Sequence, residues 1–154
     1  DDKNYLVIAD QVLGVTRIYR DPLAKPILNK QVPYVTLTTG SVQKIEFSTN
    51  NQYVYIQTGN TFVSYDFENV RGSSFVLEGE IVGGSPRWMN NSHLSYQLSD
   101  GINYLVEFDG HNKKPLVTTD PGTRLFYAGD QRSAYRIISN TSATSLELLP
   151  LVAE

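Results

Sequence analysis

The side chains that most often carry metal binding or nucleophilic catalysis are scarce in this chain, which has two histidines and no cysteine. His93 stands at the start of an alternating segment and His111 follows an Asp-Gly pair, so the two do not share one helix face as paired histidine ligands do. A serine nucleophile needs a base and an orienting acid, and no Gly-x-Ser-x-Gly sequence is present. The sequence therefore predicts no catalytic residue, no metal site and no cofactor.

Three further segments resemble functional sites only superficially. Residues 83–86 are Gly-rich, but no helix follows them to complete a phosphate-binding loop, and we interpret them as a link between repeats. Glu78 and Glu80 alternate with apolar residues in a strand predicted over 75–82, which places both carboxylates on one solvated face. Residues 99–101 (Ser-Asp-Gly) predict a hairpin turn better than a calcium site.

The composition restricts the kinds of partner. The chain has 154 residues, of which 40% are hydrophobic and 11% aromatic, and its net charge is −3. This length predicts one domain with a real core. There is no basic stripe of the kind that binds nucleic acid. No segment approaches the roughly 18 consecutive apolar residues of a membrane-spanning helix, so we expect no direct membrane insertion.

The elements that would position any site are short strands. Apolar and polar residues alternate over brief runs rich in Tyr, Val and Ile, and Gly, Asn, Asp or Pro separates them. No apolar pattern with a helical period persists, so the predicted class is all-β. The expected strands cover residues 4–10, 15–20, 42–47, 53–57, 62–67, 75–82, 87–89, 93–98, 103–108, 115–118, 124–128, 134–139 and 145–152.

The chain also repeats itself. Residues 46–66 align with residues 87–109, and a fainter copy follows around Phe126. A period of roughly 40 residues with four short strands is typical of β-propeller blades. The sequence thus predicts a partial or small β-propeller of about three to four four-stranded antiparallel blades. It would be a single domain over 1–154, with approximate blades at 1–40, 41–83, 84–119 and 120–154. The alignment matches Phe47 with Trp88, Asn50 with Asn91, Tyr53 with Leu94, Tyr55 with Tyr96, and Tyr65-Asp66 with Phe108-Asp109.

Residues 85–91 (SPRWMNN), 93–96 (HLSY), 104–110 (YLVEFDG) and 115–117 (PLV) together resemble a TolB-type (PD40, WD40-like) blade. Residues 43–69 are similar, although Asn-rich turns replace the Pro-Asp-Gly turn of that family. The resemblance implies a non-catalytic propeller in an extracytoplasmic or cell-envelope setting. It carries no activity by itself, since blades of this type serve many functions.

Both ends of the chain look like incomplete blades. The first expected strand matches the second strand of the repeat, and the last matches the third. We expect a piece of a longer propeller. Two alternatives stay open: the partial ends combine into one blade of an unusually small ring, or two chains complete a ring as a dimer. We also expect self-association through the open blade edges. The aromatic side chains are expected to pack between blades, with the tyrosine hydroxyls reaching the rim.

The predicted function is a protein-interaction or ligand-binding platform, part of a larger envelope-associated protein. Two alternatives stay open: a hydrolase or lyase with an active site at the propeller axis, and a self-assembling structural module that uses its blade edges. The first needs convergent acidic groups, histidine or a metal at the axis, and the second predicts a mass that depends on concentration. The candidate partner-binding residues occupy the same turn in each repeat: Asn50, Asn51, Asn90, Asn91, Asp130, Gln131 and Arg132.

Overall fold

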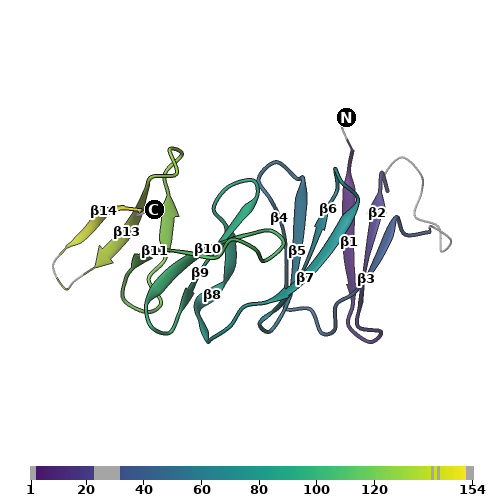
Figure 1. Cartoon of the computed structure of the whole chain (residues 1–154), viewed down its shortest axis with the longest axis horizontal. Coiled ribbons are helices and arrows are strands. Elements are labelled where there is room, and N and C mark those ends of the chain that lie inside the picture. Colours follow the sequence, from purple (N-terminus) through teal and green to yellow (C-terminus); the bar gives the residue numbers. More distant parts are fainter. Residues whose placement is uncertain (1–2, 23–31, 140, 142, 152–154) are drawn as a thin grey trace.

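The chain forms a row of antiparallel sheets in the computed structural model, which describes residues 3–22, 32–139, 141 and 143–151, apart from the side chains of 83–85. Within these residues there are strands and turns but no helix, and hence no helix that could cross a membrane. The all-β prediction is confirmed. The strands form four sheets that follow one another along the chain (Figure 1).

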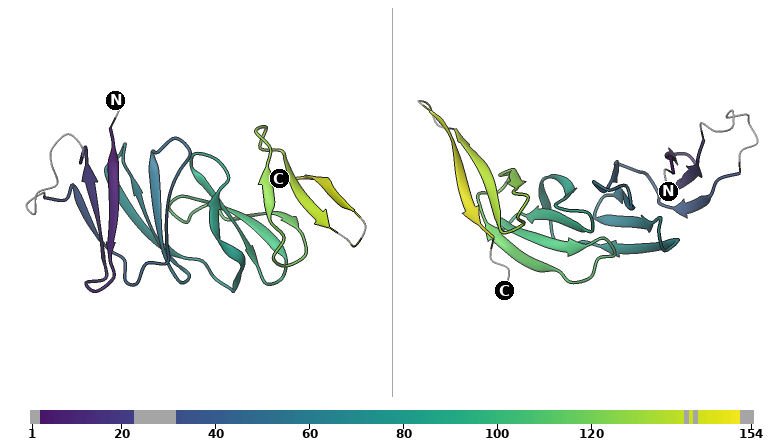
Figure 2. Two further views of the ribbon diagram at one scale, coloured as in Figure 1. Left: turned by 180° about the vertical axis from the view of Figure 1, so that it is seen from behind. Right: turned by 90° about the horizontal axis from the view of Figure 1, so that it is seen from above.

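The first sheet contains β1 (Tyr5–Asp10), β2 (Val15–Arg20) and β3 (Val35–Thr38). The second contains β4 (Lys44–Phe47), β5 (Tyr53–Thr58), β6 (Thr61–Asp66) and β7 (Arg71–Val76). The third contains β8 (Ile81–Trp88), β9 (His93–Leu98), β10 (Ile102–Glu107) and β11 (Lys114–Thr118). The fourth contains β12 (Leu125–Tyr127), β13 (Ser133–Ser139) and β14 (Thr144–Pro150). Seen from above, the sheets lie along an arc rather than a straight line (Figure 2).

Equivalent backbone hydrogen bonds identify which strand of the repeat each strand represents. The backbone amide of the first residue after the last strand of a sheet donates to a carbonyl. That carbonyl lies in the turn between the two strands that come before the last strand in the sequence. This bond joins Thr39 to Gly14, Leu77 to Asn60, and Thr119 to Gly101. Strands β1, β2 and β3 therefore correspond to the second, third and fourth strands of the middle sheets.

A second recurring bond places the strands of the fourth sheet. It closes the turn between the first and second strands of a sheet. The amides of Ser48, Met89 and Ala128 donate in turn to the carbonyls of Tyr53, His93 and Ser133. Strands β12, β13 and β14 therefore correspond to the first, second and third strands of the repeat.

The strand register corrects the predicted alignment of the two clearest repeats. Phe47 pairs with Val54, and Trp88 pairs with Leu94. The counterpart of Leu94 is therefore Val54 and not Tyr53. The reason is the turn after Trp88, which is one residue shorter than the turn after Phe47.

The same correction applies at the end of the third strand. The amide of Phe67 donates to Gln52 and that of Phe108 donates to Ser92, at the same place in each sheet. Phe67, rather than Tyr65, is thus the counterpart of Phe108.

The link between the second and third sheets also differs from the prediction. β7 ends at Val76 and β8 begins at Ile81, so residues 77–80 form the link that was expected over 83–86. Gly79 has a φ of 90°, which interrupts the extended conformation predicted through 75–82. Residues 83–86 lie instead inside β8, where its pairing with β9 shifts register. Glu78 and Glu80 are exposed on the link, not on a strand face.

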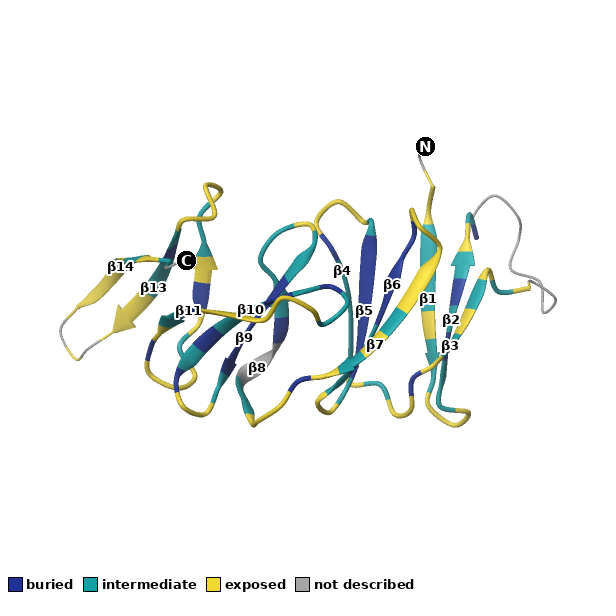
Figure 3. Cartoon of the chain, viewed as in Figure 1, coloured by how far each residue is buried: buried dark blue, intermediate teal, exposed yellow. Residues whose placement is uncertain are grey.

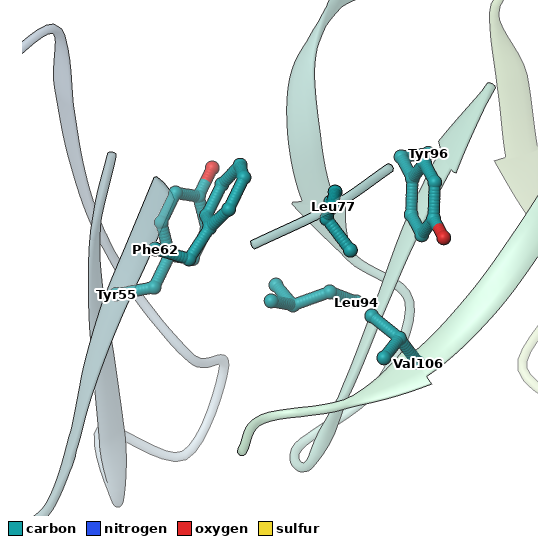
Figure 4. Packing of buried hydrophobic residues seen from close by; sticks show 6 residues of the cluster. All are labelled: Tyr55, Phe62, Leu77, Leu94, Tyr96 and Val106. Carbon is teal, nitrogen blue, oxygen red and sulfur yellow. The ribbon is translucent and has the colours of Figure 1, made fainter. Parts of the chain in front are cut away.

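The core consists of side chains between consecutive sheets, because the period of two along each strand gives every middle sheet two apolar faces. The burial colours of Figure 3 show the buried residues concentrated on β5, β6 and β9. Between the first and second sheets lie Ile18, Val54, Tyr65 and Phe67. Between the second and third lie Tyr55, Phe62, Leu77, Leu94, Tyr96 and Val106 (Figure 4).

The tyrosine hydroxyls of this core do not reach the rim as expected. The Tyr55 hydroxyl is buried, donates to Glu46 Oε2 at 2.7 Å and also contacts the carbonyl oxygen of Pro86. The Tyr96 hydroxyl is buried too, and no described residue offers it a hydrogen-bond partner. Burial accordingly raises the pKa of both phenols.

Candidate partner-binding face

One end of the molecule gathers the predicted turns. Because consecutive strands run in opposite directions, the turns β4–β5, β8–β9 and β12–β13 lie at the same end as the turns β6–β7 and β10–β11 (Figure 1). We call this end the turn face. The structure places all seven candidate residues on it.

Three of the seven candidates stabilise the turns with their own side chains. Each uses a side-chain oxygen to accept the amide two residues later, which is the Asx-turn geometry. These bonds run from Gln52 to Asn50 (3.2 Å), from Ser92 to Asn90 (2.9 Å) and from Arg132 to Asp130 (2.9 Å). The backbone bond from Arg132 also holds the pKa of Asp130 below its usual value.

The other four candidates point outward. Asn51, Asn91, Gln131 and Arg132 are all exposed. Asn51 and Gln131 have φ values of 57° and 58°, so both turns use the same left-handed position. Asn90 Nδ2 donates to Gln131 Oε1 at 2.9 Å, and this bond ties the turns of the third and fourth sheets together.

A pocket of about 250 Å³ opens on the turn face between the first and second sheets. Its lining residues are Lys3, Asn4, Tyr5, Phe47 and Asn51. The lining combines two aromatic residues, Tyr5 and Phe47, with three polar residues, Lys3, Asn4 and Asn51. Of the candidates, only Asn51 lines it.

An aromatic stack holds the two aromatic lining residues in place. The ring of Phe67 lies between Tyr5 and Phe47, with centroid separations of 4.0 Å and 6.0 Å. Phe67 is itself buried. Packing therefore holds Tyr5 and Phe47 in place, and their positions do not depend on a partner.

The corresponding place between the second and third sheets is filled. There Tyr53 stacks on Phe108 at 4.2 Å and lies 6.2 Å from Trp88. The Arg71 guanidinium covers Phe108 at 5.8 Å and reaches Asp109 at 3.7 Å. The stack of Tyr53 on Phe108 is thus equivalent to that of Tyr5 on Phe67, and an arginine of the chain itself lies over it.

The rest of the described structure offers little chemistry. No group of three or more His, Asp or Glu side chains among the described residues could hold a metal ion. His93 Nδ1 contacts Asn90 Oδ1 at 3.0 Å and Ser92 Oγ at 3.1 Å within its own turn. A cavity of about 40 Å³ between the third and fourth sheets is lined by polar groups including Arg87 and Tyr127, and it is large enough only for water.

Sequence reasoning missed Tyr5, Asn4 and Phe47 as site residues. Phe47 was recognised as a repeated aromatic, but the repeat predicted packing for it. Phe47 becomes a site residue because the start of β1 lies beside the β4–β5 turn. This proximity exists only in the folded chain.

The comparisons with known proteins support the fold. No family model matches the chain, and no curated protein matches it in sequence. The TolB-type resemblance therefore stays a prediction. Among solved structures, the N-terminal domain of Nup159 is similar with a TM-score of 0.53 and 13% identity, over 94% of this chain and 41% of that chain. A chain in a structure of S. cerevisiae Dbp5 bound to Nup159 with Gle1, IP6 and ADP gives a TM-score of 0.54 and 12% identity, over 93% and 40%.

These matches confirm the β-propeller prediction, since the Nup159 domain is a β-propeller. At this level of identity they show the fold alone. The chain spans about two fifths of the length of the chains that it matches.

Proposed function

We propose that this propeller is a non-catalytic protein-interaction module whose partner binds the turn face. The observation that carries the proposal is the pocket on the turn face that Lys3, Asn4, Tyr5, Phe47 and Asn51 line. A pocket of about 250 Å³ with aromatic and polar lining residues has room for one side chain of a partner. An anchor side chain in a preformed pocket, surrounded by a polar rim, is the usual arrangement at protein interfaces.

The turns beside the pocket favour the same function because they are already ordered. The Asx bonds of Asn50, Asn90 and Asp130 fix the three turns, and the bond from Asn90 to Gln131 joins two of them. A partner would therefore lose little binding free energy to ordering this surface. The outward amides and the Arg132 guanidinium would contact it as a rim around the anchor.

The structural neighbours are compatible with this function. One of the matched structures contains Nup159 bound to another protein, Dbp5. Binding to another protein thus has a precedent among the structures that share this fold. The envelope location expected from the TolB-type resemblance stays a prediction.

Site-directed cross-linking in the source cells tests the proposal. A photoreactive side chain is placed at Asn4, beside the pocket, and at Ser99, an exposed residue at the opposite end of the molecule. We expect a specific adduct from position 4 and none from position 99. Equal adducts from both positions would contradict the proposed face.

The cross-linked protein then serves as the ligand for affinity measurements. Asn4→Trp, which places an indole over the pocket, is expected to weaken binding at least tenfold, whereas Ser99→Trp changes it less than twofold. Alanine at Asn91 and Arg132 together is expected to weaken binding several-fold. Unchanged affinity for both the pocket and the rim variants would exclude the turn face as the binding surface.

A further inference from the structure

The outer face of the fourth sheet is apolar and uncovered in the part of the chain that the structure describes. Cross-strand pairing joins Tyr135 to Phe126 on one side and to Leu148 on the other, and joins Ile137 to Leu146, so all five side chains share one face. Four of them are large and exposed, at 40% for Phe126, 55% for Ile137, 63% for Leu146 and 57% for Leu148. On the opposite face, Leu125 and Ala134 are buried.

This face has the same position in its sheet as a face that is buried elsewhere. The turn bonds make Ser133 the counterpart of Tyr53. Tyr135 is therefore the counterpart of Tyr55, which is fully buried between the second and third sheets. The fourth sheet thus presents the surface on which a following sheet packs.

The outer face of the first sheet is the complementary half of such an interface. The amide of Asp21 donates to Asn4 as that of Phe67 donates to Gln52, which sets β1 and β5 in register. By this register three residues of the outer face have buried counterparts in the second sheet. Leu6, Ile8 and Tyr19 correspond in turn to Val54, Ile56 and Tyr65, which are 0%, 1% and 2% exposed. Ile8, by contrast, is 46% exposed.

One chain therefore carries both halves of a sheet-to-sheet interface, at opposite ends of the arc. We propose that a second copy of this chain covers them, with the fourth sheet of each copy packed on the first sheet of the other. The arc turns both end sheets toward the same side (Figure 2), so two copies related by a two-fold axis close into a ring. The neighbouring propeller chain is more than twice as long as this chain, so a ring of two copies approaches its length.

The interface proposed here buries sheet faces and does not need the open edges of β1 and β14 to pair. It is also independent of the turn face, because the end sheets meet along the arc and the turns lie at one end of the strands. Failure of either proposal therefore leaves the other standing.

Solution mass is the first test. Light scattering and sedimentation of the chain should give twice the 17.3 kDa mass of one chain, with a dissociation constant at or below about 10 μM. A single-chain mass at about 100 μM would overturn the proposal. A mass that grows without limit would overturn the closed ring, because open head-to-tail contacts form filaments.

Two single variants test the faces separately. Ile137→Lys alters the fourth-sheet face and Ile8→Lys alters the first-sheet face, and each should weaken dimerisation at least tenfold. Val12→Lys is the matched control, since Val12 is 94% exposed on the β1–β2 turn and belongs to neither face. Circular dichroism checks that all three variants keep the strand content of the parent chain.

Mixing the two face variants gives the sharpest result. A mixed head-to-tail dimer contains one Ile137→Lys chain and one Ile8→Lys chain. At one of its two contacts, the unaltered fourth sheet of the Ile8→Lys chain packs on the unaltered first sheet of the Ile137→Lys chain. The mixture should therefore dimerise more tightly than either variant alone. A mixture that is no tighter, or a control variant that is as weak as the others, would contradict head-to-tail stacking.

Discussion

Replacing Gln97 should destabilise the fold far more than replacing Gln57, although both are the fifth residue of the second strand of their sheets. Gln97 is buried and holds the segment that leads from the third sheet to the fourth. Its Nε2 donates to Thr119 Oγ1 (2.8 Å), to the Asp120 carbonyl (3.1 Å) and to the Gly101 carbonyl (3.2 Å), and its Oε1 accepts the Gly122 amide (2.7 Å).

Gln57 has much less to lose. Its Nε2 donates to the Gly59 carbonyl at 2.9 Å, and no described residue donates to its buried Oε1. A hydrogen bond contributes about 0.5–1.5 kcal/mol, and a buried polar atom without a partner costs about 1–3 kcal/mol. Gln97→Leu removes the bonds of two N–H donors, which three acceptors share, and one accepted bond for one apolar gain, so we expect the free energy of unfolding to fall by about 2–3 kcal/mol. Gln57→Leu removes one bond and one unpaired oxygen, so we expect a change within about 1 kcal/mol.

Urea unfolding followed by the fluorescence of the single tryptophan measures both values. The dependence on urea concentration should stay the same, because neither variant changes the area buried. Equal losses for the two variants would show that the hydrogen bonds of Gln97 do not hold the link, and so would a loss for Gln97→Leu under about 1 kcal/mol.

Three other predictions follow from burial and backbone conformation. Gly110→Ala would place its Cβ 2.5 Å from two side-chain atoms of Phe75, so it should lower the free energy of unfolding by about 2–4 kcal/mol in the same urea assay. Gly122→Ala is the control, because Gly122 has a similar φ and no described atom within 4 Å of the added Cβ, and it should cost about 1 kcal/mol. Burial raises the pKa of Tyr65 from 10.0 to about 12, so the unfolded chain releases this proton at a lower pH and stability should fall as pH rises from about 10 to 12. In Tyr65→Phe the melting temperature should fall less over this pH range, and an identical fall would refute the assignment. Tyr96→Phe should leave the melting temperature unchanged or higher, because its buried hydroxyl has no partner among the described residues, and a lower melting temperature would indicate a partner.

The strands could be predicted from the sequence because most of them have one apolar and one polar face, or lie between clear turns. β2 covers the predicted 15–20, and β9 the predicted 93–98. The prediction was wrong at 77–80, where apolar residues keep alternating although the chain leaves the sheet. Only the left-handed conformation of Gly79 marks the end of the strand, and residue alternation does not encode it.

The alignment of the repeats was wrong for a related reason. Both turns contain an Asn-Asn pair, so the sequence alone does not show that the second turn is one residue shorter. The hydrogen bonds show it, since Asn50 and Asn90 both accept the amide two residues later, but Asn50 lies three residues after the preceding strand and Asn90 only two. The pocket could not be predicted at all, because its lining includes Tyr5 and Phe47, which belong to different sheets.

Every strand of this chain is hydrogen-bonded only to strands that precede or follow it directly in the described sequence. Such pairings close short loops, so each sheet can form quickly and as soon as its own residues have left the ribosome. The apolar face of the first sheet, with Ile18, then stays exposed to solvent until β4–β7 have been synthesised. At about 5–20 residues per second this interval lasts a few seconds, and it is the period in which a growing chain is most exposed to aggregation and chaperone binding.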